Sequence, residues 1–231
     1  QAINPSWNYV YSANNQPDSI AGILYPGYYL SEDRGRRIVD LIAPKNDWTK
    51  EDVAVMIYDV TSPTAPEIVK DLIKSLTISD FSASEKKAIN ILENWNGFYG
   101  ENEVGPVIYN RVIYEFQKNT FEDEMGKAYA QFENTPFIEK VLPVQAKREN
   151  SVWWDDVSTK EKVETREDII TKSFKSTFSS LKYQLGENVA DWKWNRVASV
   201  EYEHPIGKAG GALRSLFNVG PFRTRGGDQV I

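Results

Sequence analysis

The chain has 231 residues, of which 41% are hydrophobic and 26% charged, a composition ordinary for a globular protein of one large or two small domains. A net charge of −6 does not favour a nucleic-acid partner. No cysteine and a single histidine exclude disulfides and thiol chemistry and leave no His-rich metal site. No apolar run in the sequence is long enough to span a bilayer.

The chain opens on a predicted strand followed by a loop. Trp7–Tyr11 is an apolar, aromatic run typical of a strand, and Asn14 and Asn15 follow it. A loop rich in Pro, Gly and Tyr then leads to Arg34 and a predicted helix start. A carboxamide donor and a guanidinium beside one loop can stabilise a developing oxyanion.

The alternative interpretation of the same residues is structural. A turn followed by a solvated helix start explains the asparagines and arginines without any chemistry. In that case Arg36 and Arg37 are surface charges or pair with Glu32 and Asp40. The spacing by itself leaves both interpretations open.

Helical periodicity dominates residues 31–186. Patterns of N-terminal capping precede predicted helices at Thr49, Ser82 and Thr165. A longer helix is predicted over residues 104–124. Its final acidic residues oppose the helix dipole, so the helix is expected to stop earlier or to turn there. Another is predicted over residues 127–142, interrupted at Pro136. The chain is therefore expected to be mainly α, with a few strands near its two ends.

The C-terminal part is predicted to be strand and loop. Residues 197–203 alternate between apolar and polar, which favours a half-buried strand. The glycine-rich loop at 207–211 lacks the pattern of a phosphate site. Asp155 and Asp156 lack the spacing of a calcium-binding loop. A hydrogen-bonded structural role is favoured for His204.

Several motifs occur in the order typical of the penicillin acylase (penicillin amidase) family of N-terminal-nucleophile hydrolases, which the sequence resembles over almost its whole length. These motifs are Ala13-Asn14-Asn15, Arg34-Gly35-Arg36-Arg37-Ile38, Trp153-Trp154-Asp155-Asp156, Trp192-Lys193-Trp194, His204-Pro205-Ile206-Gly207, Gly220-Pro221-Phe222 and Gly226-Gly227-Asp228. One departure is Asn195, where the family usually has glycine. The resemblance matches Asn14 to the family's oxyanion-hole asparagine and Arg34 to the arginine that orients the site.

The resemblance also implies an architecture. The chain would supply the helical lobe of an αββα hydrolase, as an internal piece of a larger precursor. Residues 1–30 would be a strand and active-site loop of the catalytic sheet domain, residues 31–186 the helical domain, and residues 187–231 a segment returning to the sheets. The partners would be the remaining segments of that precursor.

The implied activity is hydrolysis of an acyl amide, such as a penicillin-type side chain or an N-acyl homoserine lactone. The nucleophile would be an N-terminal Ser outside this chain, since Gln1 has no hydroxyl or thiol. The chain alone is therefore expected to be inactive. Autocatalytic processing and export to the periplasm are implied as well. No cofactor is expected; calcium occurs in some family members, but its ligands cannot be matched here. The competing hypothesis is a non-catalytic helical binding domain derived from the family.

Overall fold

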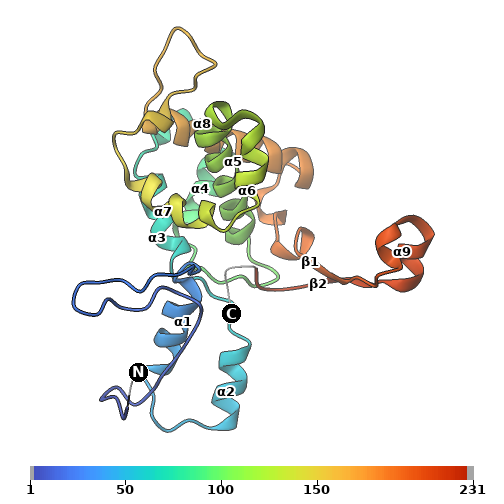
Figure 1. Ribbon diagram of the computed structural model, residues 1–231. Helices are drawn as coiled ribbons and strands as arrows, with labels where there is room; N and C mark the ends of the chain where they lie inside the picture. Colours follow the sequence, from blue (N-terminus) through green and yellow to red (C-terminus); the bar gives the residue numbers. More distant parts are fainter. Residues whose placement is uncertain (1–2, 228–231) are drawn as a thin grey trace.

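The computed structural model describes residues 3–227, so predictions that involve Gln1 or Asp228 lie outside the described residues. The elements, labelled in Figure 1, are mainly helices. In chain order they are α1 (Asp33–Ile42), α2 (Lys50–Ile57), α3 (Ala65–Ile73), α4 (Ala83–Glu93), α5 (Gly105–Met125), α6 (Tyr129–Glu133), α7 (Phe137–Lys147), α8 (Arg166–Leu185), β1 (Ser199–Tyr202), α9 (Gly211–Phe217) and β2 (Val219–Arg223). The mainly α prediction is confirmed.

Helices α3 to α8 form a helical body around one hydrophobic core (Figure 1). The long helices α5 and α8 pack against each other at its centre. Their apolar stripes bury the aromatic rings that fill most of this space. The largest completely buried side chains include Trp192, Phe116, Phe174, Phe178, Leu72, Leu92, Ile108, Ile169 and Ile170. This core gives the rest of the chain a rigid support.

The predicted capping boxes are all present. The side chains of Thr49, Ser82 and Thr165 each accept a hydrogen bond from the third backbone N–H of α2, α4 and α8. Each N-cap satisfies a backbone donor that the helix itself leaves unpaired, so each helix begins at the predicted residue. The predicted break at Pro136 also occurs, because α6 ends at Glu133 and α7 begins at Phe137.

The helix predicted over 104–124 is present; it does not stop before its acidic residues, and the chain turns directly after them. Helix α5 continues to Met125 and ends at Gly126, which has a φ of 52°. Burial and the neighbouring Asp123 raise the pKa of Glu124 to about 7. Asp123 in turn accepts a hydrogen bond from the backbone N–H of Val157 at 2.8 Å.

The predicted strand at Trp7–Tyr11 does not form. Residues 3–30 contain turns and single bridges, one of them pairing Asn15 with Leu30 in parallel. A strand needs a neighbour for its backbone N–H and C=O groups. No part of residues 3–227 lies beside Trp7–Tyr11 as such a neighbour. The apolar side chains of this run, among them Trp7 and Val10, are accordingly exposed.

The predicted strand near the C-terminus is present as β1, which pairs antiparallel with β2. Ser199 lies opposite Arg223 and Tyr202 opposite Val219, with an irregularity in register between them. Figure 1 shows this hairpin as an arm that projects from the helical body and carries α9 at its tip. The strand is more exposed than predicted: Glu201 is half-buried beside Arg214, whereas the other three residues of β1 and all of β2 are exposed.

Candidate active site

The structure brings Asn14 and Arg34 together. The Nη2 atom of Arg34, in the first turn of α1, donates to Oδ1 of Asn14 at 3.2 Å and to the backbone carbonyl of Ala13 at 3.4 Å. Asn14 has a φ of 60°, a left-handed conformation that asparagine adopts more readily than most residues. The two side chains are therefore in direct contact, although they are twenty positions apart in the sequence.

The hydrogen bond from Arg34 determines which way the Asn14 carboxamide points. A guanidinium has only donors, so the atom that faces it is the amide oxygen. The Nδ2 group then points away from Arg34, and it has no hydrogen-bond partner among residues 3–227. Asn14 is exposed to solvent. Asn14 thus presents a free N–H donor that a neighbouring positive charge polarises.

The loop between the two residues folds back on itself. The N–H of Leu30 donates to the carbonyl of Asn14 at 2.8 Å. Farther out, Tyr28 contacts α7: its ring meets Phe137 edge to face, and the Nζ atom of Lys140 lies 5.0 Å from its centroid. These contacts tether the loop at both ends, so Asn14 and the start of α1 lie side by side.

The structure distinguishes between the three arginines of the basic segment. Both Nη atoms of Arg36 contact Glu67, and one also reaches Glu32 at 3.5 Å. Arg37 binds Asp59 through two hydrogen bonds of 2.8 and 2.6 Å rather than the predicted Asp40. Each of these forks is committed to a carboxylate. Arg34 is thus the arginine of this segment that reaches Asn14.

The first residue of α1, Asp33, is buried and connects this helix to the start of α3. Its carboxylate accepts hydrogen bonds from the Ser62 hydroxyl at 2.8 Å and from the Thr64 N–H at 3.1 Å. The Ser62 hydroxyl also accepts from the N–H of Ala65 at 3.0 Å. Burial raises the pKa of Asp33, against the opposing effect of these hydrogen bonds. The arrangement joins two helix starts at one point.

Gly35 allows the asparagine loop to approach α1 closely. A Cβ atom at this position would lie 2.9 Å from Oδ1 of Asn15 and 3.0 Å from its Cγ. Such distances are shorter than ordinary van der Waals contact, so only glycine fits without displacing Asn15. The sequence motif contains this glycine, but its role in packing was not predictable from the spacing alone.

A cleft of about 940 Å³ lies beside the candidate site. Its walls come from the start of α1, from α3, α5 and α7, and from the segment around β1. Asp33 and Arg36 border it on the side of the candidate site, whereas Asn14 and Arg34 do not line it. Tyr99, Tyr109 and Trp194 supply aromatic surface. Sequence reasoning missed these lining residues because they belong to separate elements.

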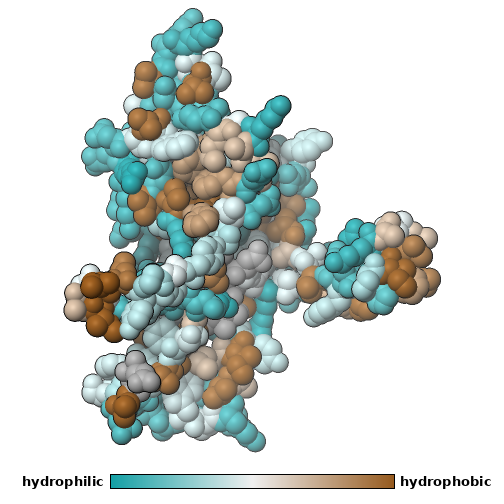
Figure 2. Space-filling model, viewed as in Figure 1, coloured by the Kyte–Doolittle hydropathy of each residue, from teal (hydrophilic) through white to brown (hydrophobic). Residues whose placement is uncertain are grey.

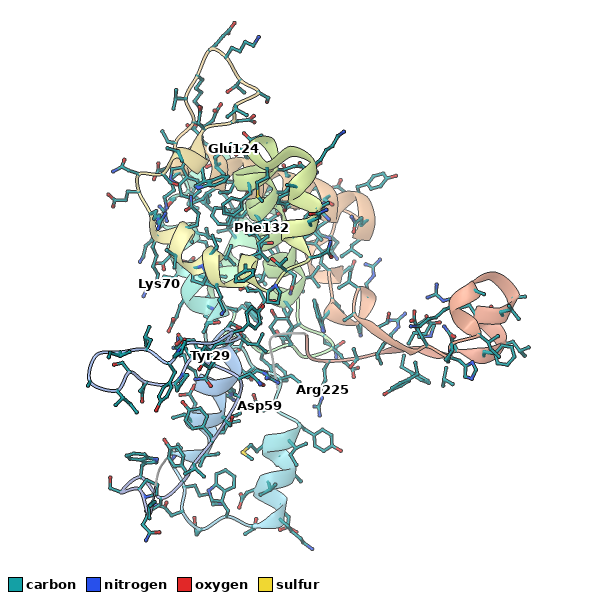
Figure 3. The ribbon with its side chains drawn as sticks, viewed as in Figure 1. Tyr29, Asp59, Lys70, Glu124, Phe132 and Arg225 are labelled. Carbon is teal, nitrogen blue, oxygen red and sulfur yellow. The ribbon has the colours of Figure 1, made fainter. Side chains whose placement is uncertain are left out.

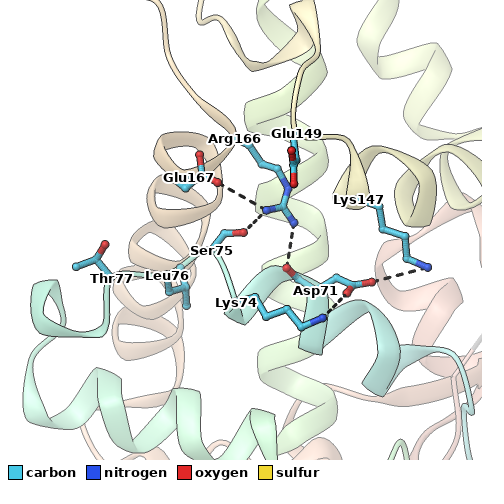
Figure 4. Close-up of a pocket in the computed structure, with 9 residues that line it drawn as sticks. All are labelled: Asp71, Lys74, Ser75, Leu76, Thr77, Lys147, Glu149, Arg166 and Glu167. Atoms are coloured by element: carbon cyan, nitrogen blue, oxygen red, sulfur yellow. Dashed lines mark hydrogen bonds and ion pairs between the residues drawn. The ribbon is translucent and has the colours of Figure 1, made fainter.

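A second cavity, of about 520 Å³, surrounds Arg166 at the start of α8 (Figure 4). Arg166 donates to the carbonyl oxygens of Ala146 and Asp71 and to the Ser75 hydroxyl. Figure 4 shows Lys74 and Lys147 pointing at the carboxylate of Asp71. The two lysines are therefore paired with Asp71, and Arg166 lies 3.8 Å from the carboxylate of Glu167. Its arginine ties α3, α7 and α8 together.

Other sequence candidates have structural contacts. His204 accepts a hydrogen bond from the N–H of Ile206 and stacks on Phe217. Within residues 3–227, no group of three or more His, Asp or Glu side chains has an arrangement that fits a metal ion. None of the helices in the described part of the chain is long and apolar enough to cross a membrane.

Comparison with known proteins gives one clear result. No curated protein sequence matches the chain. A family model described as penicillin amidase matches residues 1–231, which is the entire sequence. The match includes the asparagine loop, the arginine segment and the C-terminal motifs that carry the resemblance. The chain therefore belongs to the penicillin amidase family, a family of amidohydrolases.

Proposed function

We propose that this chain supplies the oxyanion-stabilising side and the helical lobe of an amidohydrolase that cleaves an acyl amide bond. The observation that carries the proposal is the hydrogen bond from Arg34 to Oδ1 of Asn14. It leaves the Nδ2 group free to donate to a developing negative charge. Membership of the penicillin amidase family supports the reaction class.

The reaction requires a nucleophile, and the family resemblance supplies an N-terminal Ser from a segment outside these 231 residues. Its oxygen attacks the amide carbonyl, its proton passes to its own α-amine, and the carbonyl electrons move to the oxygen. The oxyanion accepts a hydrogen bond from Nδ2 of Asn14. Collapse of this intermediate expels the amine, which takes the proton, and water then hydrolyses the acyl ester.

Arg34 contributes by holding the donor rather than by contacting the substrate. Its fixed fork keeps Oδ1 of Asn14 turned away from the substrate and leaves the N–H exposed. Its charge also draws electron density from the amide, so that the N–H becomes a stronger donor. A preorganised donor of this kind does not have to reorient as the charge develops.

The surface of the chain supports its role as one lobe of a larger catalytic unit. Most of the exposed large apolar side chains lie in residues 3–30 and 197–222. Figure 2 shows hydrophobic patches on the loop at the left and on the arm at the right. The resemblance assigns both segments to the catalytic sheet domain. Contiguous exposed apolar surface is typical of protein contacts, and the sheets of the processed precursor are the proposed cover.

The proposed substrates are amides of penicillin-type side chains or N-acyl homoserine lactones. The cleft of about 940 Å³ falls within the size range of small-molecule sites and combines aromatic walls with a few polar groups. It supports a role of the helical lobe in binding the acyl part. Export to the periplasm and autocatalytic processing belong to the same proposal through the family resemblance.

The test compares two substitutions of Asn14 in the processed full-length protein. Asn14→Asp keeps an acceptor for Arg34 but has no N–H to donate. Asn14→Gly removes the carboxamide and tolerates the φ of 60°. Alanine is a poorer choice, because its Cβ adds strain at this backbone angle. Both variants should lower kcat on the order of 10²- to 10³-fold.

The matched control is Asn8→Gly, because Asn8 is also exposed and has a φ of 63°. It should leave kcat unchanged, and the melting temperatures of all three variants should stay close to that of the parent. Unchanged kcat in both Asn14 variants would remove the oxyanion role. If the intact processed protein hydrolyses no phenylacetyl, phenoxyacetyl or long-chain acyl amide, the non-catalytic binding domain becomes the better interpretation.

A further inference from the structure

One face of α1 carries three contacts to the helical body. Asp33, Arg36 and Arg37 stand at positions i, i+3 and i+4, which share a helix face. All of their main partners lie in one short segment, residues 59–67, which follows α2 and runs into the first turn of α3. Arg34 and Gly35 point elsewhere, toward the asparagine loop. Helix α1 therefore lies between that loop and segment 59–67.

The two arginine contacts are forks rather than single bonds. Arg37 donates Nε and Nη2 to the two oxygens of Asp59, and these side chains are 23% and 15% exposed. Arg36 donates both Nη groups to Glu67 at 3.0 and 2.7 Å. Asp59 lies beside α1 just below the helical body (Figure 3). Two planar forks on adjacent residues resist rotation of the helix about its axis.

Segment 59–67 is itself attached to the core. The N–H of Tyr99 donates to the carbonyl of Val60, and the N–H of Ser62 donates to the carbonyl of Gly97, each at 2.9 Å. The side chain of Val60 belongs to the core cluster. The segment that carries these carboxylates is thus attached to the hydrophobic core.

We propose that Asp59 and Glu67, through Arg37 and Arg36, are positioning residues of the candidate active site. They set the rotation of α1, and thereby the place from which Arg34 holds the Asn14 carboxamide. The inference rests on the proposed oxyanion role of Asn14. It identifies the residues that support this role, and these residues contact neither Asn14 nor the loop that carries it.

The first variant is Arg37→Gln in the processed full-length enzyme. Loss of the fork lets α1 turn, and a small displacement of a catalytic donor lowers kcat on the order of tenfold to 100-fold. KM should change by less than about twofold, because the lost interaction belongs to the transition state. The matched control is Arg111→Gln in α5, whose ion pair with Glu115 has similar side-chain exposures of 30% and 10%. It should leave kcat unchanged.

The decisive measurement combines Arg37→Gln with Asn14→Gly. If Arg37 acts through the carboxamide of Asn14, the double variant should be no slower than Asn14→Gly alone. If the two losses multiply, or if Arg111→Gln lowers kcat as much as Arg37→Gln, the inference is overturned. Should Arg37→Gln fail to fold, Arg36→Gln breaks the more exposed fork and enters the same comparison.

The two proposals fail in different ways. Unchanged kcat in Asn14→Gly removes the oxyanion role, and the positioning role with it. A slow Asn14→Gly beside an unimpaired Arg37→Gln leaves the oxyanion role in place and overturns only the positioning role of segment 59–67.

Discussion

The helical body and the N-terminal segment of residues 3–30 differ in how they are held. In the body, side chains such as Phe174 are completely buried. In the N-terminal segment, Val10 is 69% and Tyr25 50% exposed, whereas Ala13 is the hydrophobic residue that is buried there. Stability therefore resides in one region, and the candidate chemistry in a region with no core of its own.

This contrast shows what a site on such a segment requires. Asn14 depends on a small number of contacts: the hydrogen bond from Arg34, the backbone bond from Leu30 and the close packing of Asn15 on Gly35. Two of these contacts come from α1, which is itself fastened to the body. Rigidity thus reaches the site through one helix rather than through packing around it.

The largest expected effect separates the two regions by stability. Phe174→Ala removes a ring that is 0% exposed and should lower the free energy of unfolding by about 3–5 kcal/mol. Trp7→Ala removes a larger side chain that is 56% exposed, so it should change that free energy by less than about 0.5 kcal/mol. Urea unfolding measures both. A comparable loss for Trp7→Ala would mean that the N-terminal segment has a core after all.

The second prediction concerns the junction between the regions. Ser62 is 2% exposed and bonds both Asp33 and the first turn of α3. Ser62→Ala leaves a buried carboxylate without one of its donors, so the free energy of unfolding should fall by about 1–3 kcal/mol. The exposed Ser79→Ala is the control for the change of residue type. Equal stabilities of the two variants would contradict the role of Asp33 as a buried anchor.

The third prediction separates activity from stability. Gly35→Ala pushes a Cβ against Asn15, which must shift by a few tenths of an ångström or more. Alanine favours the helix by up to about 1 kcal/mol, and this gain offsets the contact. We therefore expect little change in melting temperature and a kcat lower by roughly tenfold, since Asn15 adjoins the donor. An unaffected kcat would show that the asparagine loop tolerates this displacement.

The smallest expected effect is a dependence of folding stability on pH, which arises from Glu124 in the helical body. Partial burial of the carboxyl and its hydrogen bond with Asp123 raise the pKa of Glu124 to about 7 from an ordinary value of 4.5, although the residue as a whole remains exposed to solvent. A raised carboxyl pKa makes the folded state hold its proton more tightly, so stability falls as the pH rises through this window. Glu124→Gln removes the ionisable group, and with it this loss of stability at higher pH.

The gain should be less than about 1 kcal/mol at pH 8, because Glu124 is exposed to solvent. It should vanish near pH 4, where the carboxyl is protonated in both states. Thermal unfolding of parent and variant at the two pH values measures it. If Glu124→Gln raised the stability equally at pH 4 and at pH 8, a raised pKa of Glu124 would be contradicted.

Local features of the sequence were sufficient for the helices. The caps at Thr49, Ser82 and Thr165 and the break at Pro136 act within one turn of chain, so their consequences were predictable. The end of α5 was not, because one of its acidic residues, Asp123, is bonded by the backbone of Val157, which lies far along the chain. The strand at Trp7–Tyr11 failed for a related reason, since a strand forms only beside another.

The sequence by itself determined the helical class, the family motifs and the candidacy of Asn14 and Arg34. Tertiary structure alone decided that Arg34, and neither Arg36 nor Arg37, reaches Asn14. It also decided that Asp59, Glu67 and Ser62 support α1. The physical reason is one of range: caps and periodicity act between neighbours, whereas the partner of a long charged side chain depends on which segments the fold brings within a few ångströms.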